Sequence, residues 1–201
     1  RICEDTEVLG YVGEDINKKL LYIAASSRKL SDPISVIVLS ESASGKSYLV
    51  DTIKKLMPTE DVVSMTSLSE QALNYLPEDG LIHKFLVMGE AVHGEVIEHQ
   101  IREMLSAKEL SRLVTTKDEK TGTLVSKMVR KEVIVSSVMS STNYDLNAEN
   151  ASRCFVINTD ESEAQTKNIH RMQRQKYSLK RYETKEKRIP EIIRQHHMAQ
   201  R

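Results

Sequence analysis

A polar segment at residues 40–47, Ser-Glu-Ser-Ala-Ser-Gly-Lys-Ser, separates an apolar run from a helical pattern. The apolar run spans Ile34 to Leu39, and the apolar positions of the helical pattern continue to Met57. Strand, polar loop and helix in this order are the context in which a Gly-Lys-Ser tripeptide binds phosphate. The segment therefore predicts a nucleoside triphosphate site in an α/β fold.

Each part of such a loop has a chemical role. The backbone N–H groups of the loop and of the helix N-terminus would bind the phosphates, Lys46 would reach the β- and γ-phosphates, and the Ser47 hydroxyl would ligate Mg²⁺. Ser40 stands where the pattern has glycine, so the loop must begin in a conformation that a side chain tolerates. A plain polar turn is the alternative, and the flanking strand and helix favour the phosphate loop. The expected nucleotide-binding residues are Ser40, Glu41, Ser42, Ala43, Ser44, Gly45, Lys46, Ser47 and Tyr48.

Length and composition limit the class of protein. A chain of 201 residues has the size of one α/β domain with short appendages. It has no apolar run of membrane-spanning length and no apolar signal segment, so no membrane partner is expected. The two cysteines, Cys3 and Cys154, lack a metal-ligand spacing, which makes a reducing cytoplasm the expected location. A start at Arg1 suggests a fragment of a longer protein.

The charge of the chain is unevenly distributed although its formal total is zero. Residues 108–131 contain seven Lys/Arg against three Asp/Glu, a net of +4. Residues 167–201 contain eleven against three, a net of +8, so the remainder carries −12. Two basic segments on an acidic body suit a phosphate backbone, and the alternative is a solvated hairpin and a solvated helix.

The apolar periodicity predicts strands that alternate with helices. This alternation indicates an α/β fold with a mostly parallel five-stranded sheet, an inserted β-hairpin and a C-terminal helix. Three regions follow: a helical lead-in at 1–32, a core at 33–160 with the hairpin at 111–131, and a basic helical segment or linker at 161–201. The expected strands are 34–39, 62–65, 84–88, 133–139 and 153–158, with hairpin arms at 113–116 and 123–125 and helices within 12–30, 49–57, 68–76, 96–105 and from 161 onward.

Three further residues follow or precede predicted strands and could carry catalysis. Glu90 follows the apolar strand 85–88 and would orient the attacking water and, through a water molecule, help Ser47 to hold Mg²⁺; its alternative role is to cap the next helix. Asn143 could bind the γ-phosphate or the water, or could only form a turn. Arg153 cannot easily reach its own loop and could act on a neighbouring subunit, or could form a surface ion pair.

The order of these parts resembles an AAA+ ATPase of the branch that has a β-hairpin before the sensor 1 strand. In chain order they are the phosphate loop, the strand ending in Glu90, a helix, the hairpin, Thr142-Asn143 and Ser152-Arg153. Glu90 ends a segment similar to a Walker B motif, with Gly89 at the Asp position. The branch includes MCM and superfamily 3 viral helicases, and residues 12–14, 26–30 and 163–174 further resemble primase-helicase proteins of bacterial mobile elements and phages.

This resemblance implies a P-loop NTPase (AAA+) three-layer fold, ATP and Mg²⁺ as cofactors, a homo-oligomeric ring such as a hexamer, and single-stranded or forked DNA as partner. A primase partner or fused domain is also implied. The expected function is the motor of a DNA helicase or translocase in mobile-element or phage replication. A nucleotide-gated loader or assembly module with weak hydrolysis, and less so a small-molecule P-loop kinase, are the alternatives. The hairpin would contact DNA through Lys117 and Lys120 at its tip and through Lys127, Arg130 and Lys131 on its returning arm.

Overall fold

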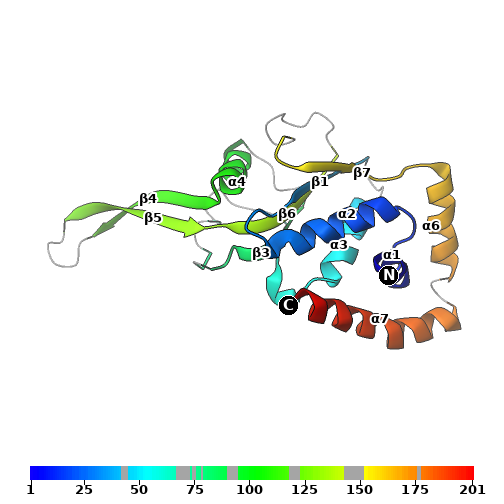
Figure 1. The fold of residues 1–201 in the computed structure, drawn as a ribbon. Helices are drawn as coiled ribbons and strands as arrows, with labels where there is room; N and C mark the ends of the chain where they lie inside the picture. Colours follow the sequence, from blue (N-terminus) through cyan, green and yellow to red (C-terminus); the bar gives the residue numbers. More distant parts are fainter. Residues whose placement is uncertain are drawn as a thin grey trace.

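The centre of the computed structural model is a five-stranded sheet with the strand order β2-β3-β6-β1-β7 (Figure 1). All neighbouring strands are parallel, so the predicted α/β class with a central parallel sheet is confirmed. The structure describes residues 1–41, 45–66, 73, 76–77, 79–89, 95–117, 123–142, 152–175 and 178–201. The strands of this sheet are β1 Ser35–Leu39, β2 Val62–Met65, β3 Ile82–Met88, β6 Ile134–Ser141 and β7 Phe155–Asn158.

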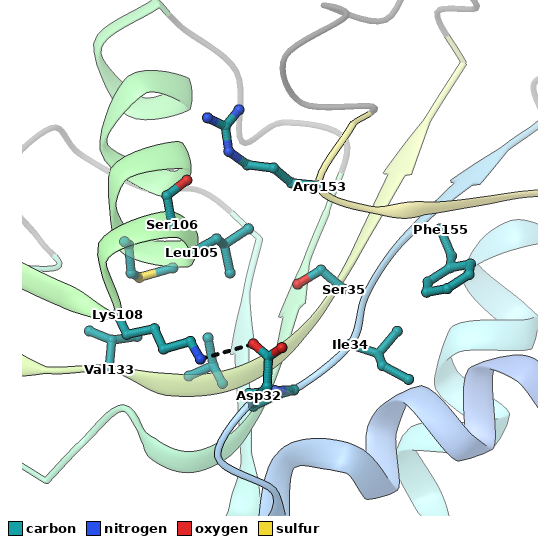
Figure 2. A pocket seen from close by; sticks show the side chains of 12 residues that line it. Asp32, Ile34, Ser35, Leu105, Ser106, Lys108, Val133, Arg153 and Phe155 are labelled. Atoms are coloured by element: carbon teal, nitrogen blue, oxygen red, sulfur yellow. Dashed lines mark ion pairs between the residues drawn. The ribbon is translucent and has the colours of Figure 1, made fainter.

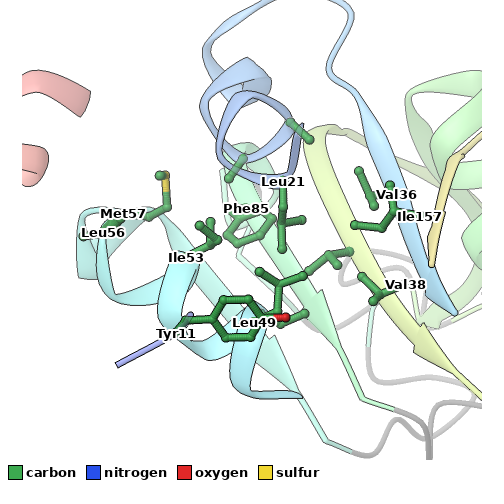
Figure 3. Close-up of a cluster of buried hydrophobic side chains, with 14 of the residues drawn as sticks. Tyr11, Leu21, Val36, Val38, Leu49, Ile53, Leu56, Met57, Phe85 and Ile157 are labelled. Atoms are coloured by element: carbon green, nitrogen blue, oxygen red, sulfur yellow. The ribbon is translucent and has the colours of Figure 1, made fainter. Parts of the chain in front are cut away.

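Helices cover both faces of the sheet. The helices are α1 Ile2–Leu9, α2 Asp15–Ser26, α3 Lys46–Lys55, α4 Glu95–Ala107, α6 Glu163–Gln175 and α7 Leu179–Gln200. On one face, α2 and α3 pack their apolar side chains against β1, with Leu21, Leu49 and Phe85 fully buried (Figure 3). On the other face α4 packs Ile101 and Met104 against β3 and the start of β6. Because both faces are covered, β1 is buried along its whole length and its sequence is a continuous apolar run.

The inserted hairpin lies outside this three-layer body. It consists of β4 Glu109–Lys117 and β5 Leu124–Glu132, which pair antiparallel from Glu109 opposite Glu132 to Lys117 opposite Leu124. Figure 1 shows the pair extending away from the sheet, and only Val133 separates β5 from β6. Each arm has nine residues and is longer than expected. The sequence pattern underestimated the arms because both faces of the hairpin are largely exposed, and their polar residues obscure the pattern of a strand.

The N-terminal and C-terminal segments contain more helices than expected. α1 was not predicted, and it ends at Gly10, whose φ of 111° is the left-handed conformation that commonly terminates helices. The basic C-terminal segment forms α6 and α7 rather than one helix. α7 packs on α1, where His196 Nε2 lies 3.0 Å from Asp5 Oδ2. The helix expected at 68–76 lies almost entirely outside the described residues.

None of the helices in the described part of the chain combines the length and the apolar character needed to cross a membrane.

Candidate nucleotide site

The carboxyl ends of the parallel strands bring three chain segments together at one edge of the sheet. Ser40 directly follows β1, and its N–H lies 3.4 Å from the carbonyl oxygen of Ser141 at the end of β6. Thr159, directly after β7, donates its N–H to the carbonyl oxygen of Leu39 at 3.2 Å. Ligands of open α/β sheets bind at this edge, where loops after neighbouring strands meet. The phosphate loop therefore lies at the expected end of the sheet.

The N-terminus of α3 is open toward the position where phosphates would lie. Gly45 precedes α3 with a φ of 97°, and its carbonyl oxygen accepts the N–H of Leu49 at 3.0 Å to close the first turn. Glycine has no side chain that could bind the first N–H groups, which in any α-helix lack acceptors within the helix. Among the described residues, no heavy atom lies within 4 Å of the position that a Cβ on Gly45 would take. The N–H groups and the helix dipole thus fit an anion.

Lys46 is the first residue of α3 and is held over the start of the loop. Its side chain is buried, and Nζ donates to the carbonyl oxygens of Ser40 and Glu41, each at 2.8 Å. Ser40 is also buried, and its φ lies outside the left-handed region, so serine in place of glycine needs no strained backbone. The ammonium is therefore positioned beside the site that the helix N-terminus offers. Residues 42–44 of the predicted loop lie outside the described residues.

Ser47 and Tyr48 complete the first turn of α3, and both are exposed. An exposed hydroxyl in this turn fits the predicted role of Ser47 as a Mg²⁺ ligand. The Tyr48 hydroxyl instead donates to the carbonyl oxygen of Leu9 at 3.3 Å, and its ring lies 5.9 Å from that of Tyr11. Tyr48 therefore presents its backbone N–H to the site, while its side chain joins α3 to the segment between α1 and α2.

That segment forms one border of the site. The Tyr11 hydroxyl donates to Glu14 Oε1 at 2.7 Å, and Asn17 Nδ2 donates to the carbonyl oxygen of Asn158 at 2.7 Å. Burial, followed by the hydrogen bond to Glu14, raises the pKa of Tyr11 well above its usual value, so Tyr11 remains protonated. Sequence analysis missed the contact between Asn17 and Asn158 because these residues are far apart in the chain.

Three exposed carboxylates, Glu41, Asp160 and Glu161, form a second border, here named the acidic rim. Glu161 Oε1 accepts the N–H of Glu41 at 2.8 Å. Asp160 Oδ1 accepts the N–H of Ser162 at 2.9 Å ahead of α6, and this hydrogen bond lowers the pKa of Asp160. Glu41 was expected to bind nucleotide, whereas Asp160 and Glu161 were not predicted. Asp160 and Glu161 follow β7, a strand parallel to β1, by two and three residues, and this position is the signal that would have identified them.

Two of the three predicted catalytic residues, Glu90 and Asn143, lie outside the described residues. The residue before Glu90 is described: the N–H of Gly89 donates to the carbonyl oxygen of Met65 at 3.0 Å. A Cβ on Gly89 would stand 3.7 Å from that oxygen, an ordinary van der Waals distance, and the φ of Gly89 is not positive. Neither space nor backbone conformation therefore requires glycine at the Walker B aspartate position.

Arg153 lies at the opposite edge of the sheet. It precedes β7, whose Phe155 is paired with Val36 of β1, whereas the phosphate loop follows Leu39. At ~3.3 Å per residue, the six positions from the level of Arg153 to Ser40 correspond to roughly 20 Å. Arg153 therefore does not share a site with Lys46 of its own chain. It is exposed and lines a pocket of about 400 Å³ with Lys108 and Phe155 (Figure 2).

The hairpin register divides the predicted DNA-binding cations between two faces. Lys127 and Lys131 share a face with Arg112, which was not predicted, and within β4 and β5 that face has no carboxylate. Lys117 and Arg130 share the other face. Arg130 Nε is 3.7 Å from Glu109 Oε1, and Lys131, at the hairpin base, donates to the carbonyl oxygen of Leu76. Lys117 and Lys127 are exposed, and Lys120 lies outside the described residues.

Comparison with known proteins agrees with the loop geometry. The family model described as the MTBMA_p00010 P-loop domain matches residues 1–198 of the chain. No curated protein matches it. A P-loop domain binds nucleotide, typically with Mg²⁺, and the open helix N-terminus with Lys46 and Ser47 has the residues for this task. The chain therefore belongs to the MTBMA_p00010 P-loop domain family.

Proposed function

We propose that this P-loop domain is the ATP-hydrolysing motor of a DNA helicase or translocase, of the type that replicates mobile elements or phages, and that it works as a homo-oligomeric ring such as a hexamer. The observation that carries the proposal is that one strand, β6, runs from the hairpin at its amino end to the nucleotide edge at its carboxyl end. β5 passes into β6 through Val133 alone, and β6 is hydrogen-bonded to β1, which leads into the phosphate loop. A shift of β6 caused by nucleotide would therefore move the hairpin as a rigid extension.

The arrangement of the strands supports hydrolysis at this edge. β6 separates β1 from β3, so the ends of β1 and β3 are two strand spacings, about 10 Å, apart. A phosphate and an attacking water fit in that distance. Glu90 follows β3 by two residues and would orient the water, whereas Asn143 follows β6 by two residues and would bind the γ-phosphate or the water. Bound Mg²⁺ would neutralise the phosphate charge beside Ser47.

The cations of the hairpin, of which Lys117 and Lys127 are exposed, support DNA as the partner. Aromatic side chains are absent from the sequence 109–132, so contacts to the phosphate backbone are favoured over base stacking. Arg112, Lys127 and Lys131 share one face of the hairpin, and within β4 and β5 that face has no carboxylate. Such a face suits contacts to the phosphate backbone. Single-stranded or forked DNA would follow this face and the hairpin tip at Lys117 and Lys120. A primase, as a partner protein or a fused domain, would supply the primers.

ATP hydrolysis with and without single-stranded DNA tests the proposal, and we expect DNA to raise it. Replacing Lys117 and Lys127 together with alanine should abolish this stimulation and weaken DNA binding. The slope of log affinity against log salt should decrease by about 1.4, since each lost contact to a single strand contributes about 0.7. The control replaces the exposed Lys19 and Lys55, which removes the same charge from the body. Equal salt slopes for both double variants would remove the hairpin from the DNA path.

Gly89 favours a second candidate function, a nucleotide-gated loader or assembly module with weak hydrolysis. Because a Cβ at this position would make only ordinary van der Waals contacts, Gly89→Asp should supply the missing carboxylate and raise Mg²⁺-dependent hydrolysis about tenfold, or ~1.4 kcal/mol in activation free energy. Gly89→Asn is the control of equal size without charge. Steady-state turnover measured across Mg²⁺ concentrations checks this prediction. Identical turnover of both variants would show that the absent aspartate does not limit hydrolysis.

A further inference from the structure

We propose that the outward face of α6 is a second DNA-binding surface, which holds the phosphate backbone through a row of basic side chains. The proposed function gives a role to the basic hairpin and none to the second basic segment, residues 167–201. Figure 1 shows α6 and the hairpin at opposite ends of the molecule. A DNA segment on α6 is therefore distinct from the segment on the hairpin of the same copy, and the inference goes beyond the proposed function.

Helical spacing places the basic side chains of α6 in one row. They are Lys167, His170, Arg171 and Arg174, here named the α6 row, and they recur at intervals of three and four residues. All four side chains are exposed. The row extends over roughly 10 Å, since an α-helix rises ~1.5 Å per residue. Over that length a DNA duplex presents about six phosphate charges, at one per ~1.7 Å, so every basic side chain can have a partner.

The opposite face of α6 fixes the helix on the body. Gln165 is buried there, and its Nε2 donates to the carbonyl oxygen of Val12 at 2.7 Å. The Gln165 amide occupies the space that a Cβ on Gly13 would need, so α6 approaches this segment closely. Ile169 and Met172, both partly buried, continue the same face. The α6 row is therefore held outward by a helix whose orientation is fixed.

Contacts within the chain leave the C-terminal half of the row positive. Lys167 Nζ is 2.7 Å from Glu163 Oε1, in an exposed pair. Arg171 donates to the side-chain oxygen of Asn168 at 2.9 Å, a partner without charge. Arg174 lies in the last turn, where the helix dipole favours a cation, and within the described residues neither arginine forms an ion pair with a carboxylate. Each guanidinium has five N–H donors and binds phosphate oxygens in a bidentate geometry.

The carboxylates near α6 gather at its N-terminal end. Asp160, Glu161 and Glu163 complement the helix dipole there and repel a phosphate backbone from the first turn. From residue 164 to the end of α6 the sequence has no Asp or Glu. DNA on this face would therefore contact the middle and last turns, at Arg171 and Arg174.

The arrangement of α6 favours DNA over an anionic membrane surface. A helix that binds a membrane surface buries its apolar residues among the lipids. In α6 the apolar residues Ile169 and Met172 lie on the face that is turned toward the body, opposite the row. The row itself has no apolar or aromatic residue, so contacts to a phosphate backbone are also favoured over base stacking.

The test measures binding of a short labelled duplex to the full chain by fluorescence anisotropy. The background is the Lys117→Ala/Lys127→Ala chain, so that the hairpin contributes little. Adding Arg171→Ala and Arg174→Ala should lower affinity at low salt by roughly 10- to 100-fold and lower the slope of log affinity against log salt by about 1.8, since each duplex contact contributes about 0.9. A decrease of about 1.4, seen with a labelled single strand instead, would assign that form of DNA to the surface.

Two control variants are made in the same background. Lys19→Ala with Lys55→Ala removes the same charge from the body and should leave the salt slope unchanged. Arg171→Lys with Arg174→Lys keeps the charge and should retain the slope. Alanine is the strongest helix former, so α6 is expected to stay folded without its arginines, and circular dichroism checks this.

A hairpin variant that has no residual DNA binding would overturn the surface. So would salt slopes equal to those of the Lys19/Lys55 control, or binding to phosphatidylserine vesicles that the arginine substitutions abolish while DNA binding stays unchanged. ATP hydrolysis, measured with the hairpin intact, separates this inference from the proposed function. A reduced salt slope in a chain that does not hydrolyse ATP keeps the α6 surface and removes the motor. DNA-stimulated hydrolysis with arginine variants that bind like the control keeps the motor and removes the α6 surface.

Discussion

Lys46→Ala is expected to abolish measurable nucleotide binding. The ammonium is held at the start of the loop by the carbonyl oxygens of Ser40 and Glu41, where a phosphate at the N-terminus of α3 would meet it. Charge-assisted hydrogen bonds contribute ~1.5–3 kcal/mol each, so losing the contacts to two phosphates lowers affinity by roughly 10² to 10⁴. Titration calorimetry with ATP and Mg²⁺ measures this loss directly.

Thermal unfolding provides an independent measurement of the same variant. ATP at one hundred times its dissociation constant should stabilise the unchanged chain by about 2.7 kcal/mol. The Lys46→Ala chain should show no such stabilisation, whereas Lys54→Ala, on the same helix, should show it in full. Removing Lys46 also leaves two loop carbonyl oxygens without their ammonium partner, so the variant is expected to unfold at a lower temperature even without ATP. Nucleotide affinity equal to that of Lys54→Ala would disprove the phosphate-loop assignment.

The phosphate loop and the parallel sheet could be predicted because both depend on local patterns. The apolar run before Ser40 is continuous since β1 is buried on both faces, and the helical spacing after it matches the face of α3 that packs on the sheet. β2 was predicted with its observed bounds at Val62–Met65. α1 was missed because only Thr6 in it is buried, which gives no apolar stripe.

The borders of the site could not be predicted, because they depend on register and backbone conformation. Glu161 reaches Glu41 only because β7 lies parallel and adjacent to β1, and this neighbour relation is not encoded in either segment alone. The left-handed φ of Lys108 is likewise invisible in a sequence that has no glycine there. The positions of Glu90, Asn143 and Lys120 stay predictions, since these residues lie outside the described part of the chain.

Arg153→Ala is expected to leave ATP binding intact and to lower turnover by roughly 10³ to 10⁵, the contribution of an arginine finger in other phosphoryl-transfer systems. The reason is its place in the fold. Arg153 precedes β7 at the amino edge, roughly six strand residues or 20 Å from the phosphate loop of its own chain. It can therefore stabilise a transition state only at the nucleotide of another copy. Binding affinity by calorimetry and turnover by phosphate release measure the two effects separately.

Mixing two inactive variants decides whether Arg153 acts on a neighbouring copy. Lys46→Ala cannot hold ATP but retains Arg153, whereas Arg153→Ala holds ATP but lacks the arginine. At an interface where the Arg153→Ala copy holds the nucleotide and the Lys46→Ala copy supplies the guanidinium, both groups are present. If copies assemble at random through one head-to-tail interface, about a quarter of the interfaces have this arrangement. An equimolar mixture should therefore recover about a quarter of the normal turnover. An arginine that acted within its own chain would give no recovery at any ratio, because every chain in the mixture then lacks one of the two groups.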